Sequence, residues 1–365
     1  MSTIKEITGY LESIAPLELQ ESYDNAGLIV GDGNTEVKGV LICLDSTEDV
    51  IEEAMKHNCN LVIAHHPIIF SGLKKLNGKN YVERTVIKAI QNNVAIYAAH
   101  TNLDNIHEGV NAKICERLGL KNCEILSPKK NLLKKLVTFC PVDHAEKVRN
   151  ALFKAGCGQI GNYDECSFNA EGTGTFRGGE NSNPFAGEKG KRSNEREVRI
   201  ETIFESFNEA GIIHALLEAH PYEEVAYDIY SLANSYQSVG SGMIGEMEVP
   251  MAEPDFLKHL KSSMQTGCIR HTKLTGNKVS KVAVCGGSGS FLLKDAISKG
   301  AQFFVTADFK YHEFFDADGK TVIADIGHYE SEQFTKDLFR DLLVKKFSTF
   351  AVRLSEAGKN PVYYF

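Results

Sequence analysis

The feature that most constrains the fold of this chain is a repeat between its two ends. With Cys43 set against Cys285, an offset of 285 − 43 = 242 residues, the following stretches align without a gap and His66 meets Asp308. In both copies an apolar run is followed by a helical pattern and then by a second apolar run. That order predicts a βαβ unit with parallel strands and a right-handed crossover. We therefore expect an α/β unit near each end of the chain.

Each copy then continues to a strand that ends in a histidine, with a carboxylate four residues later. His100 aligns with His328 and Asp104 with Glu332, at offsets of 328 − 100 = 228 and 332 − 104 = 228. Apolar βαβ patterns align by chance, but a paired His-x-x-x-carboxylate makes chance the weaker explanation. We interpret the two copies as a duplicated unit whose halves face one another across a shared site.

The chain is long enough for two or three domains, and its pattern changes near residue 128. We expect residues 1–128 and 240–365 to form the two α/β halves of one core, with residues 129–239 as an inserted α+β domain. The insert alternates strand, helix and strand twice, which resembles the ferredoxin-like plan. Its Gly-, Asn- and Ser-rich stretch 169–194 is predicted to be a mobile loop.

Composition argues against several classes of protein. The net charge of −8 disfavours nucleic-acid binding through phosphate neutralisation. No apolar stretch approaches the roughly 20 residues that span a bilayer, and the N-terminus lacks the profile of a signal peptide. The nine cysteines are odd in number and form no C-x-x-C pair. We therefore expect a cytoplasmic protein with free thiols and no membrane attachment.

Histidines gather where the predicted strands end. His65 and His66 follow one apolar run, His100 follows a second and His328 a third. Open α/β sheets place their ligands at such strand ends, and imidazole with carboxylate suits zinc, iron or manganese. A single one of these histidines is more often an ordinary core or surface residue. Three clusters related by a repeat favour a metal site.

The pattern further indicates two ions rather than one. Side chains of His65 and His66 diverge at a strand end, so they are expected to serve two ions. Two-metal sites hold ions roughly 3.5–4 Å apart and act in hydrolysis. Glu332 is the candidate bridging carboxylate, expected in the first turn of a helix spanning 331–347, where the helix dipole favours its anionic form.

Two other stretches leave alternatives open. The loop Gly286-Gly287-Ser288-Gly289-Ser290 follows an apolar run, so its amides could cradle a phosphate or simply form a tight turn. The polar groups of Asp24 and Asp45 could line the metal cleft, or could belong to a turn or a helix cap. His312 is an intermediate candidate, because it lies close to Asp308, the repeat position of His66.

Five motifs occur here in the order found in one known family. They are Tyr23-Asp24-Asn25-Ala26-Gly27-Leu28, Ala64-His65-His66-Pro67, His100-Thr101-Asn102-Leu103-Asp104, Thr306-Ala307-Asp308 with Tyr311-His312, and Gly327-His328 with Ser331-Glu332. Together they resemble the dinuclear-metal family of GTP cyclohydrolase I type 2 homologues, the Ngg-one-interacting-factor-three-like proteins. The resemblance covers essentially the whole chain.

The resemblance implies a ligand set, an assembly and an insert. The implied metal ligands are His65, His66, Asp104, His328 and Glu332, with His100 close by. They would hold two divalent ions per chain, with zinc favoured over iron, manganese, cobalt or nickel. The family also implies a toroidal homohexamer whose sites face an inner cavity. The insert is similar to the PII and CutA trimeric fold, through the stretches 171–177, 183–185 and 220–224.

We therefore expect a metal-dependent hydrolase acting on a small molecule, with nucleotides such as GTP among the candidates. His100 or His312 would act as general acid or base, and Asp45, Asp308 or Asn102 would orient groups. With GTP as substrate, attack would fall on C8 of the imidazole ring. The alternatives are a regulatory protein that binds metal and ligand without catalysis, and a metal chaperone.

Overall fold

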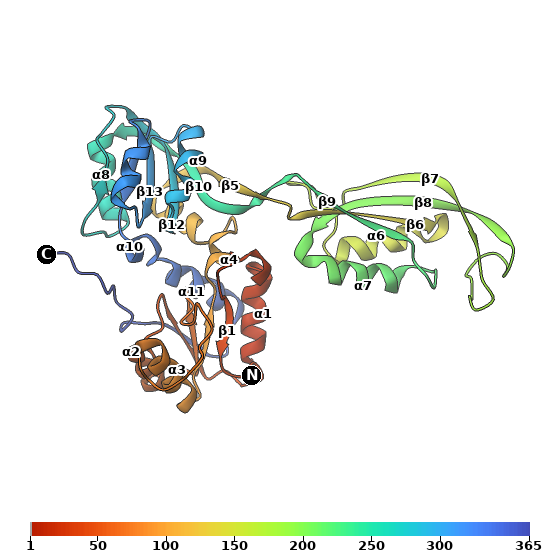
Figure 1. Ribbon diagram of the computed structural model, residues 1–365, viewed down its shortest axis with the longest axis horizontal. Helices are drawn as coiled ribbons and strands as arrows, with labels where there is room; N and C mark the ends of the chain where they lie inside the picture. The colour runs from red at the N-terminus through yellow and green to blue at the C-terminus, as the bar shows by residue number, and fades with distance from the viewer. Residues whose placement is uncertain (1) are drawn as a thin grey trace. The chain divides into compact units, whose positions relative to one another are not determined.

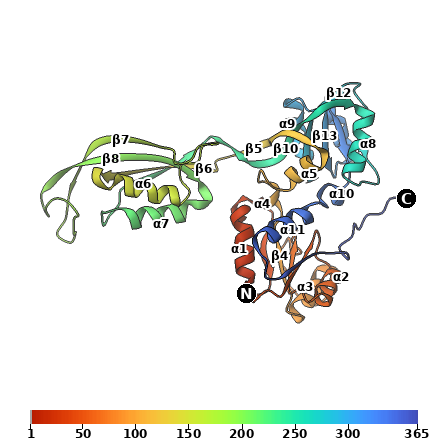
Figure 2. The ribbon, with the colours of Figure 1, turned by 180° about the vertical axis from the view of Figure 1, so that it is seen from behind.

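The structure is a computed structural model that describes residues 2–365 (Figures 1 and 2). The chain forms two compact units. Unit 1 combines the chain up to Pro128 with Gln237–Phe365, and unit 2 is Lys129–Tyr236. Among the described residues, no helix is long and apolar enough to cross a membrane.

The first half of unit 1 is built on a five-stranded sheet in the order β1-β4-β3-β2-β15. Its three central strands are parallel, β1 is antiparallel to β4, and β15 is parallel to β2. The central strands are continuous runs of buried aliphatic residues, as expected where helices cover both faces of a parallel sheet. The strands are β1 (Gly27–Val30), β2 (Gly39–Cys43), β3 (Leu61–Ala64), β4 (Ala95–Ala98) and β15 (Ala351–Leu354).

Helices of this half begin at caps that the sequence provides. The Thr3 hydroxyl accepts from the Glu6 amide and the Glu6 carboxylate accepts from the Thr3 amide, which forms a capping box at the start of α1. At α2 and α3 the cap is a single hydrogen bond, because the side chains of Thr47 and Asn80 each accept from one backbone amide of the helix. The helices are α1 (Ile4–Ile14), α2 (Glu48–Lys56), α3 (Tyr81–Gln91), α4 (Thr101–Asp104) and α5 (Val110–Leu118).

The second half carries a six-stranded sheet in the order β11-β14-β13-β12-β10-β5. Strands β12, β13 and β14 are parallel, and β11 is antiparallel to β14 just as β1 is to β4. The strands are β5 (Leu120–Lys130), β10 (Ser235–Ala252), β11 (Arg270–His271), β12 (Lys278–Ser288), β13 (Phe303–Ala307) and β14 (Val322–Asp325).

Strand register agrees with the sequence repeat. Ile42 pairs with Ile63 in the first sheet, and Val284 pairs with Val305 in the second. Both pairs keep the offset of 242 residues, since 284 − 42 = 242 and 305 − 63 = 242. The predicted parallel βαβ arrangement is therefore confirmed in both copies.

The helix predicted for residues 331–347 is wrong. The chain forms a short helix α10 (His328–Glu332) and then α11 (Thr335–Lys346), so Glu332 ends a helix of five residues instead of opening a long one. The Ser331 hydroxyl accepts from the Gly287 amide and donates to the His328 carbonyl, which ties α10 to the end of β12. The helix-dipole argument for the charge on Glu332 therefore fails. The other helices of this half are α8 (Glu253–Ser263) and α9 (Leu293–Ser298).

Unit 2 has the element order βαββαβ and one antiparallel sheet in the order β7-β8-β6-β9. Helices α6 and α7 pack on one face of this sheet (Figure 1). They bury an aliphatic core that includes Leu136, Val148, Ile200 and Leu216. The elements are β6 (Leu133–Pro141), α6 (Ala145–Lys154), β7 (Ser167–Arg177), β8 (Arg192–Glu205), α7 (Glu209–Ala219) and β9 (Tyr227–Leu232).

The loop predicted for residues 169–194 is also wrong over much of its length. Strand β7 runs on to Arg177 and β8 begins at Arg192, which leaves 178–191 as the connection. Most side chains of β7 are exposed, so the strand has no apolar alternation by which to recognise it. Gly174 has a packing reason, because a Cβ there would lie 2.0 Å from a carboxylate oxygen of Glu197.

Candidate metal centre

Four histidines from the two halves of unit 1 meet where the parallel strands end. His65 and His66 directly follow β3, His100 lies two residues beyond β4, and His328 lies three residues beyond β14. The ring of His66 lies 4.9 Å from that of His65, 5.4 Å from that of His100 and 5.2 Å from that of His328, measured between centroids. The structure therefore brings the predicted histidines together as a cluster of imidazoles.

The two histidines after β3 are held by acceptors of the first half. His65 is fully buried, and its Nδ1–H donates to the carbonyl of Ala99 at 2.9 Å. The Nδ1–H of His66 donates to the carboxylate of Asp45 at 2.8 Å. These bonds fix both rings with Nε2 directed away from the acceptors.

The other two histidines are also held through Nδ1, in both cases by a carboxylate. His100 donates from Nδ1 to Asp24 at 2.8 Å, and His328 donates from Nδ1 to Asp308 at 2.6 Å. Metal-binding histidines commonly donate their second ring N–H to a carboxylate or a carbonyl, which fixes the tautomer and the ring orientation. All four imidazoles of the cluster therefore keep Nε2 for the centre of the site.

Three atoms define what we call the outer position: Nε2 of His66, Nε2 of His328 and Oε2 of Glu332. Oε2 lies 2.9 Å from the His66 nitrogen and 3.2 Å from the His328 nitrogen, and the two nitrogens are 3.3 Å apart. Tetrahedral zinc with bonds of 2.0–2.1 Å places its ligand atoms about 3.3 Å apart. The outer position thus has the spacing of one face of a coordination tetrahedron.

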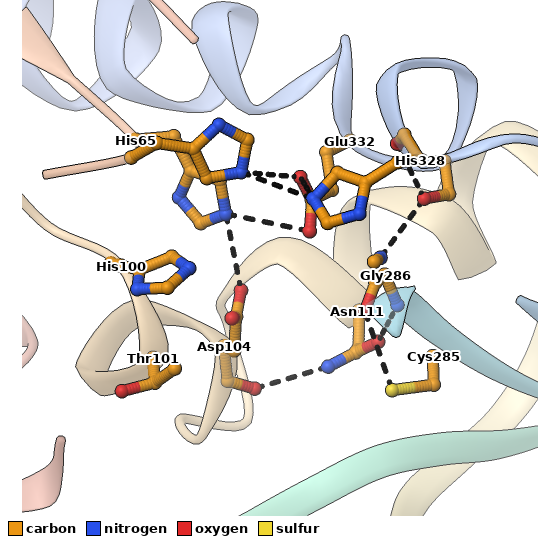
Figure 3. A network of polar contacts seen from close by, with 12 residues as sticks. His65, His100, Thr101, Asp104, Asn111, Cys285, Gly286, His328 and Glu332 are labelled. Carbon is orange, nitrogen blue, oxygen red and sulfur yellow. Dashed lines mark hydrogen bonds and ion pairs between the residues drawn. The ribbon is translucent and has the colours of Figure 1, made fainter. Parts of the chain in front are cut away.

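A second set of atoms defines the inner position: Nε2 of His65, Oδ1 of Asp104 and Oε1 of Glu332. The His65 nitrogen lies 3.6 Å from the Asp104 oxygen and 3.7 Å from the Glu332 oxygen (Figure 3). Both the His65 nitrogen and the Asp104 oxygen are buried without a hydrogen-bond partner. Burying polar atoms without a partner is costly, and a cation between them would remove that cost.

Glu332 belongs to both positions, with one carboxylate oxygen directed to each. Its side chain fits because of two glycines at the end of β12. A Cβ at Gly287 would lie 2.5 Å from Oε1 of Glu332, and one at Gly286 would lie 3.4 Å from its Cγ. Gly287 also has φ +61°, a backbone conformation that glycine adopts readily.

The phosphate-cradle interpretation of this glycine-rich loop is wrong for its first two amides. The Gly286 amide donates to the side-chain carbonyl of Asn111, and the Gly287 amide donates to the Ser331 hydroxyl, both at 2.9 Å. Both amides therefore donate to groups of the same chain, and the absence of side chains at these glycines leaves room for Glu332.

Charges at the outer position are balanced by protons when no cation is bound. Burial opposes a charge on His66, yet Asp45 and Glu332 raise its pKa to about 10. Burial also opposes a charge on His328, yet Asp308 and Glu332 raise its pKa to about 11. The neighbouring carboxylates therefore favour the charged form of both rings.

At the inner position the pKa values of two neighbouring carboxyl groups are shifted in opposite directions. Burial and the charge of Glu332 raise the pKa of Asp104 well above its usual range. Burial opposes the charge on Glu332 as well, but the adjacent imidazoles lower its pKa well below its usual range. Burial lowers the pKa of His65, which favours the neutral ring with a lone pair on Nε2.

Other predicted residues have different positions. Asn102 is buried, accepts from the His100 amide and donates to the Ala15 carbonyl, so it holds the backbone at His100. His312 is exposed and its ring contacts those of Tyr311 and Phe315. Within residues 2–365, no hydrogen bond or ion pair joins His312 to the histidine cluster.

Two supporting residues escaped the sequence analysis. Asn111 donates to the Asp104 carbonyl at 3.1 Å and accepts from Gly286, so it links the two halves. Asp325, at the end of β14, accepts from the amides of Phe309 and Gly327 and pairs with Arg270. In the sequence, Asp325 could have been recognised as a supporting residue because it is a carboxylate within an otherwise apolar run.

Comparisons with known proteins agree with this arrangement. The family model Duf34/NIF3 (NGG1p interacting factor 3) matches residues 2–361. A GTP cyclohydrolase 1 type 2 homolog of Halalkalibacterium halodurans is 40% identical over 351 residues, which cover 94% of each chain. One of Bacillus subtilis is 37% identical over 364 residues, with 98% of this chain and 97% of the relative covered.

A solved structure gives the same answer for the fold. The crystal structure of a Bacillus cereus protein related to NIF3 superposes with a TM-score of 0.86 at 39% identity, covering 100% of this chain and 99% of that one. His65, His66 and His100 form one group that could hold a metal ion, and His66, His328 and Glu332 form another. The chain belongs to the Duf34/NIF3 (NGG1p interacting factor 3) family.

Proposed function

We propose that this protein is a dinuclear-metal-dependent hydrolase that acts on a small molecule. The observation that carries the proposal is the convergence of three Nδ1-anchored imidazoles, those of His65, His66 and His328, on one carboxylate, Glu332, whose two oxygens are directed to different positions. A bridging carboxylate between two cation positions is the arrangement that two-metal hydrolases use.

The residues present fit such ions by their chemistry as well as by their spacing. The inner position would hold an ion through His65, Asp104 and Glu332, and the buried Nε2 of His65 and Oδ1 of Asp104 have no hydrogen-bond partner among residues 2–365. The outer position would hold one through His66, His328 and Glu332. Imidazole and carboxylate together favour zinc, with iron, manganese, cobalt or nickel as alternatives. When bound, such ions supply Lewis acidity and lower the pKa of water toward neutrality.

His100 is the residue that we propose for proton transfer. Its Nδ1–H donates to Asp24, and burial is outweighed there by hydrogen bonds from His100 and Thr101 that lower the pKa of Asp24 to about 2. An ionised carboxylate behind an imidazole fixes the tautomer and stabilises the ring once Nε2 takes a proton. We assign Asp308 a positioning role through its bond to His328, and no role to His312 within a single chain.

The substrate class rests on the relatives. Several of them carry the name GTP cyclohydrolase 1 type 2 homolog, so GTP is the first substrate to test, and other nucleotides follow. A net charge of −8 on the chain adds no general attraction for a polyphosphate, so recognition would have to come from the metal ions and local groups.

The test combines elemental analysis with turnover. Purified wild type, His65→Ala and Glu332→Ala are measured for metal content and for hydrolysis of GTP and a nucleotide panel. Near two metals per chain in wild type, less in both variants, and turnover only in wild type would support the proposal. No metal after exposure to zinc or manganese would overturn it.

A second candidate is a regulatory protein that binds metal and ligand without catalysis. Unit 2 favours it, because a compact βαββαβ unit in the middle of the chain has no contribution to the described metal cluster. Ligand binding by the fully metallated protein, with no product over hours, would select this candidate.

The family resemblance also leads us to propose an assembly and a division of labour. Residues 1–128 and 240–365 would form one metal-binding core, and residues 129–239 a PII/CutA-like insert. Six chains would form a ring, which light scattering of the purified protein would detect as a mass of six times 40.3 kDa.

A further inference from the structure

Unit 2 contains a cavity that plays no part in the metal centre. Its volume is about 680 Å³, within the range of small-molecule pockets. All of its lining residues lie between Phe139 and Ala226, so unit 2 forms it alone. The walls come from β7, β8 and the segments 178–186 and 222–226.

Strand register places this cavity on the sheet face opposite the helices. Gly172 opposes Glu197 on the neighbouring strand, and Ala170 and Phe139 both oppose Arg199, so these side chains share one face. Residues of the other parity on β8, among them Ile200, belong to the core under α6 and α7. The cavity therefore belongs to the face that the helices leave open.

Glu197 is an unusual residue for such a face, because only 8% of its surface is exposed. Its carboxylate accepts one hydrogen bond, from the Tyr222 hydroxyl at 2.8 Å. No lysine, arginine or histidine within residues 2–365 forms an ion pair with it. Burying a carboxyl group with few polar partners is costly, and the side chains of residues 2–365 give this one no ion-pair partner.

Two arginines near the cavity already have acidic partners. Arg199 pairs with Glu201 at 2.9 Å, and Arg196 pairs with Glu171 at 3.0 Å. Across the whole lining, acidic side chains outnumber basic ones. The acidic lining residues are Glu171, Glu197, Glu223 and Glu224, and the basic ones are Arg177 and Arg199.

Three aromatic rings line the same cavity as the carboxylate. The ring of Tyr222 lies 6.2 Å from that of Phe176 and 6.1 Å from that of Phe185, between centroids, and the pairs are tilted rather than stacked. All three residues line the cavity. Ring faces attract organic cations, and the attraction grows where water is excluded.

A glycine on β7 makes room for the carboxylate of Glu197 itself. A Cβ at Gly174 would lie 2.0 Å from Oε2 of Glu197, so any side chain at this position would displace the carboxylate. The glycine at position 174 of β7 is therefore explained by its packing against a residue of the cavity, and not by a mobile loop.

We propose that unit 2 binds a small organic cation of the amidine, guanidine or amine class. Glu197 provides its counter-charge and three aromatic rings provide its walls. The cation would pair with the Glu197 oxygen that Tyr222 leaves free, and its apolar body would lie among the rings. This site is independent of the metal centre and of the proposed hydrolase activity.

The test is a charge series of one shape, measured on the full chain by calorimetry or ligand-observed NMR. Benzamidine is a flat cation, benzamide its neutral analogue and benzoate the matching anion. We expect benzamidine to bind at least about tenfold more tightly than benzamide, and benzoate not at all, because a charged hydrogen bond is worth more than a neutral one.

Variants locate the interaction. Glu197→Gln should reduce benzamidine affinity to that of benzamide, whereas Glu218→Gln, an exposed position on α7, should leave it unchanged. Circular dichroism checks folding, and if Glu197→Gln does not fold, the wild-type charge series decides alone.

Three results would overturn the proposal. They are the absence of benzamidine binding, equal affinity for benzamidine and benzamide, and full affinity in a folded Glu197→Gln protein. Equal affinities would mean that the carboxylate only holds Tyr222 in place. No binding at all would mean that the cavity is closed in solution, for example by a second copy of the chain.

Discussion

The two halves of unit 1 share the order of four strands, β1-β4-β3-β2 and β11-β14-β13-β12, but contribute unlike groups to the candidate metal centre. The first half supplies a fully buried, neutral His65, held by a backbone carbonyl. The second supplies His328, whose side chain is 41% exposed and held by a carboxylate. At the repeat position where the first half has His66, the second has Asp308, which serves the neighbouring His328. A duplicated scaffold therefore yields an asymmetric site, with a buried inner position and an accessible outer one.

The largest effect is expected at the one residue that both positions share. Glu332→Gln should remove both metals and abolish turnover, because a neutral amide cannot balance two cations. The loss of metal affinity should exceed the about 10–100-fold loss that is typical when a residue that only hydrogen-bonds to a metal ligand is removed. Elemental analysis and titration with zinc measure it, and Glu330→Gln, a buried neighbour on α10, is the matched control. Retention of one metal at full affinity would show that the positions are independent.

Next in size is the contrast between the two histidines. His65→Ala should lower the unfolding free energy of the metal-free protein by about 2 kcal/mol, because it opens a cavity in a closed interior. His328→Ala should change it little, because that ring is partly in water. Urea unfolding in chelator gives both values, and equal losses would contradict the buried–accessible distinction.

Each variant should also reduce metal content toward one ion per chain.

A smaller effect is expected from the carboxylates that orient the rings. Asp45→Asn and Asp308→Asn should each weaken the outer position by about 10–100-fold and spare the inner one. Competition with a coloured chelator resolves the two affinities. Asp24→Asn makes the comparison sharper, since it should lower turnover with metal content unchanged. If all three variants lost metal equally, His100 would be a ligand rather than a proton carrier.

The smallest effect concerns a feature in which the halves agree. Glu83 accepts from the Asn77 and Lys79 amides, and Glu253 accepts from the Thr275 and Gly276 amides, so each pins a loop to a helix start. Backbone bonds lower the pKa of Glu83, and at Glu253 such bonds outweigh the opposing effect of burial.

A carboxylate whose folded pKa is depressed stabilises the protein above its unfolded pKa. That contribution is lost as the pH falls through the folded value, so acid should weaken both halves below about pH 4.5. In urea titrations the difference between wild type and Glu253→Gln should shrink from pH 7 to pH 4. A difference that stays constant over this range would exclude the carboxylate charge as its source.

Much of the centre follows from local sequence, because strand ends are local features. Apolar runs located β3, β4, β13 and β14, and the histidines after them were therefore placed correctly. The repeat also predicted that His328 and Glu332 would meet His66. What decided these cases was the fixed geometry of parallel strands, whose carboxyl ends share one edge.

Residues that depend on distant packing were harder to assign. Asp24 and His100 are 76 positions apart, and nothing local in the sequence distinguishes a histidine partner from a turn or a cap. The Ser331 hydroxyl accepts from the Gly287 amide of β12, a long-range contact that a helical sequence pattern does not record. Strand β7 was assigned to a loop because its exposed side chains and glycines carry no alternation.

The chain path at the boundary of unit 1 has a consequence for how such proteins change length. Strands β5 and β10 are neighbours in one sheet, and a Cβ at Gly240 would lie 2.2 Å from the Ser127 carbonyl oxygen. The chain therefore leaves and returns at adjacent points, as at the tip of a hairpin. A shorter chain could close there with a two-residue turn. A hundred residues could be gained or excised at that tip without changing the register of the strands that carry the histidines.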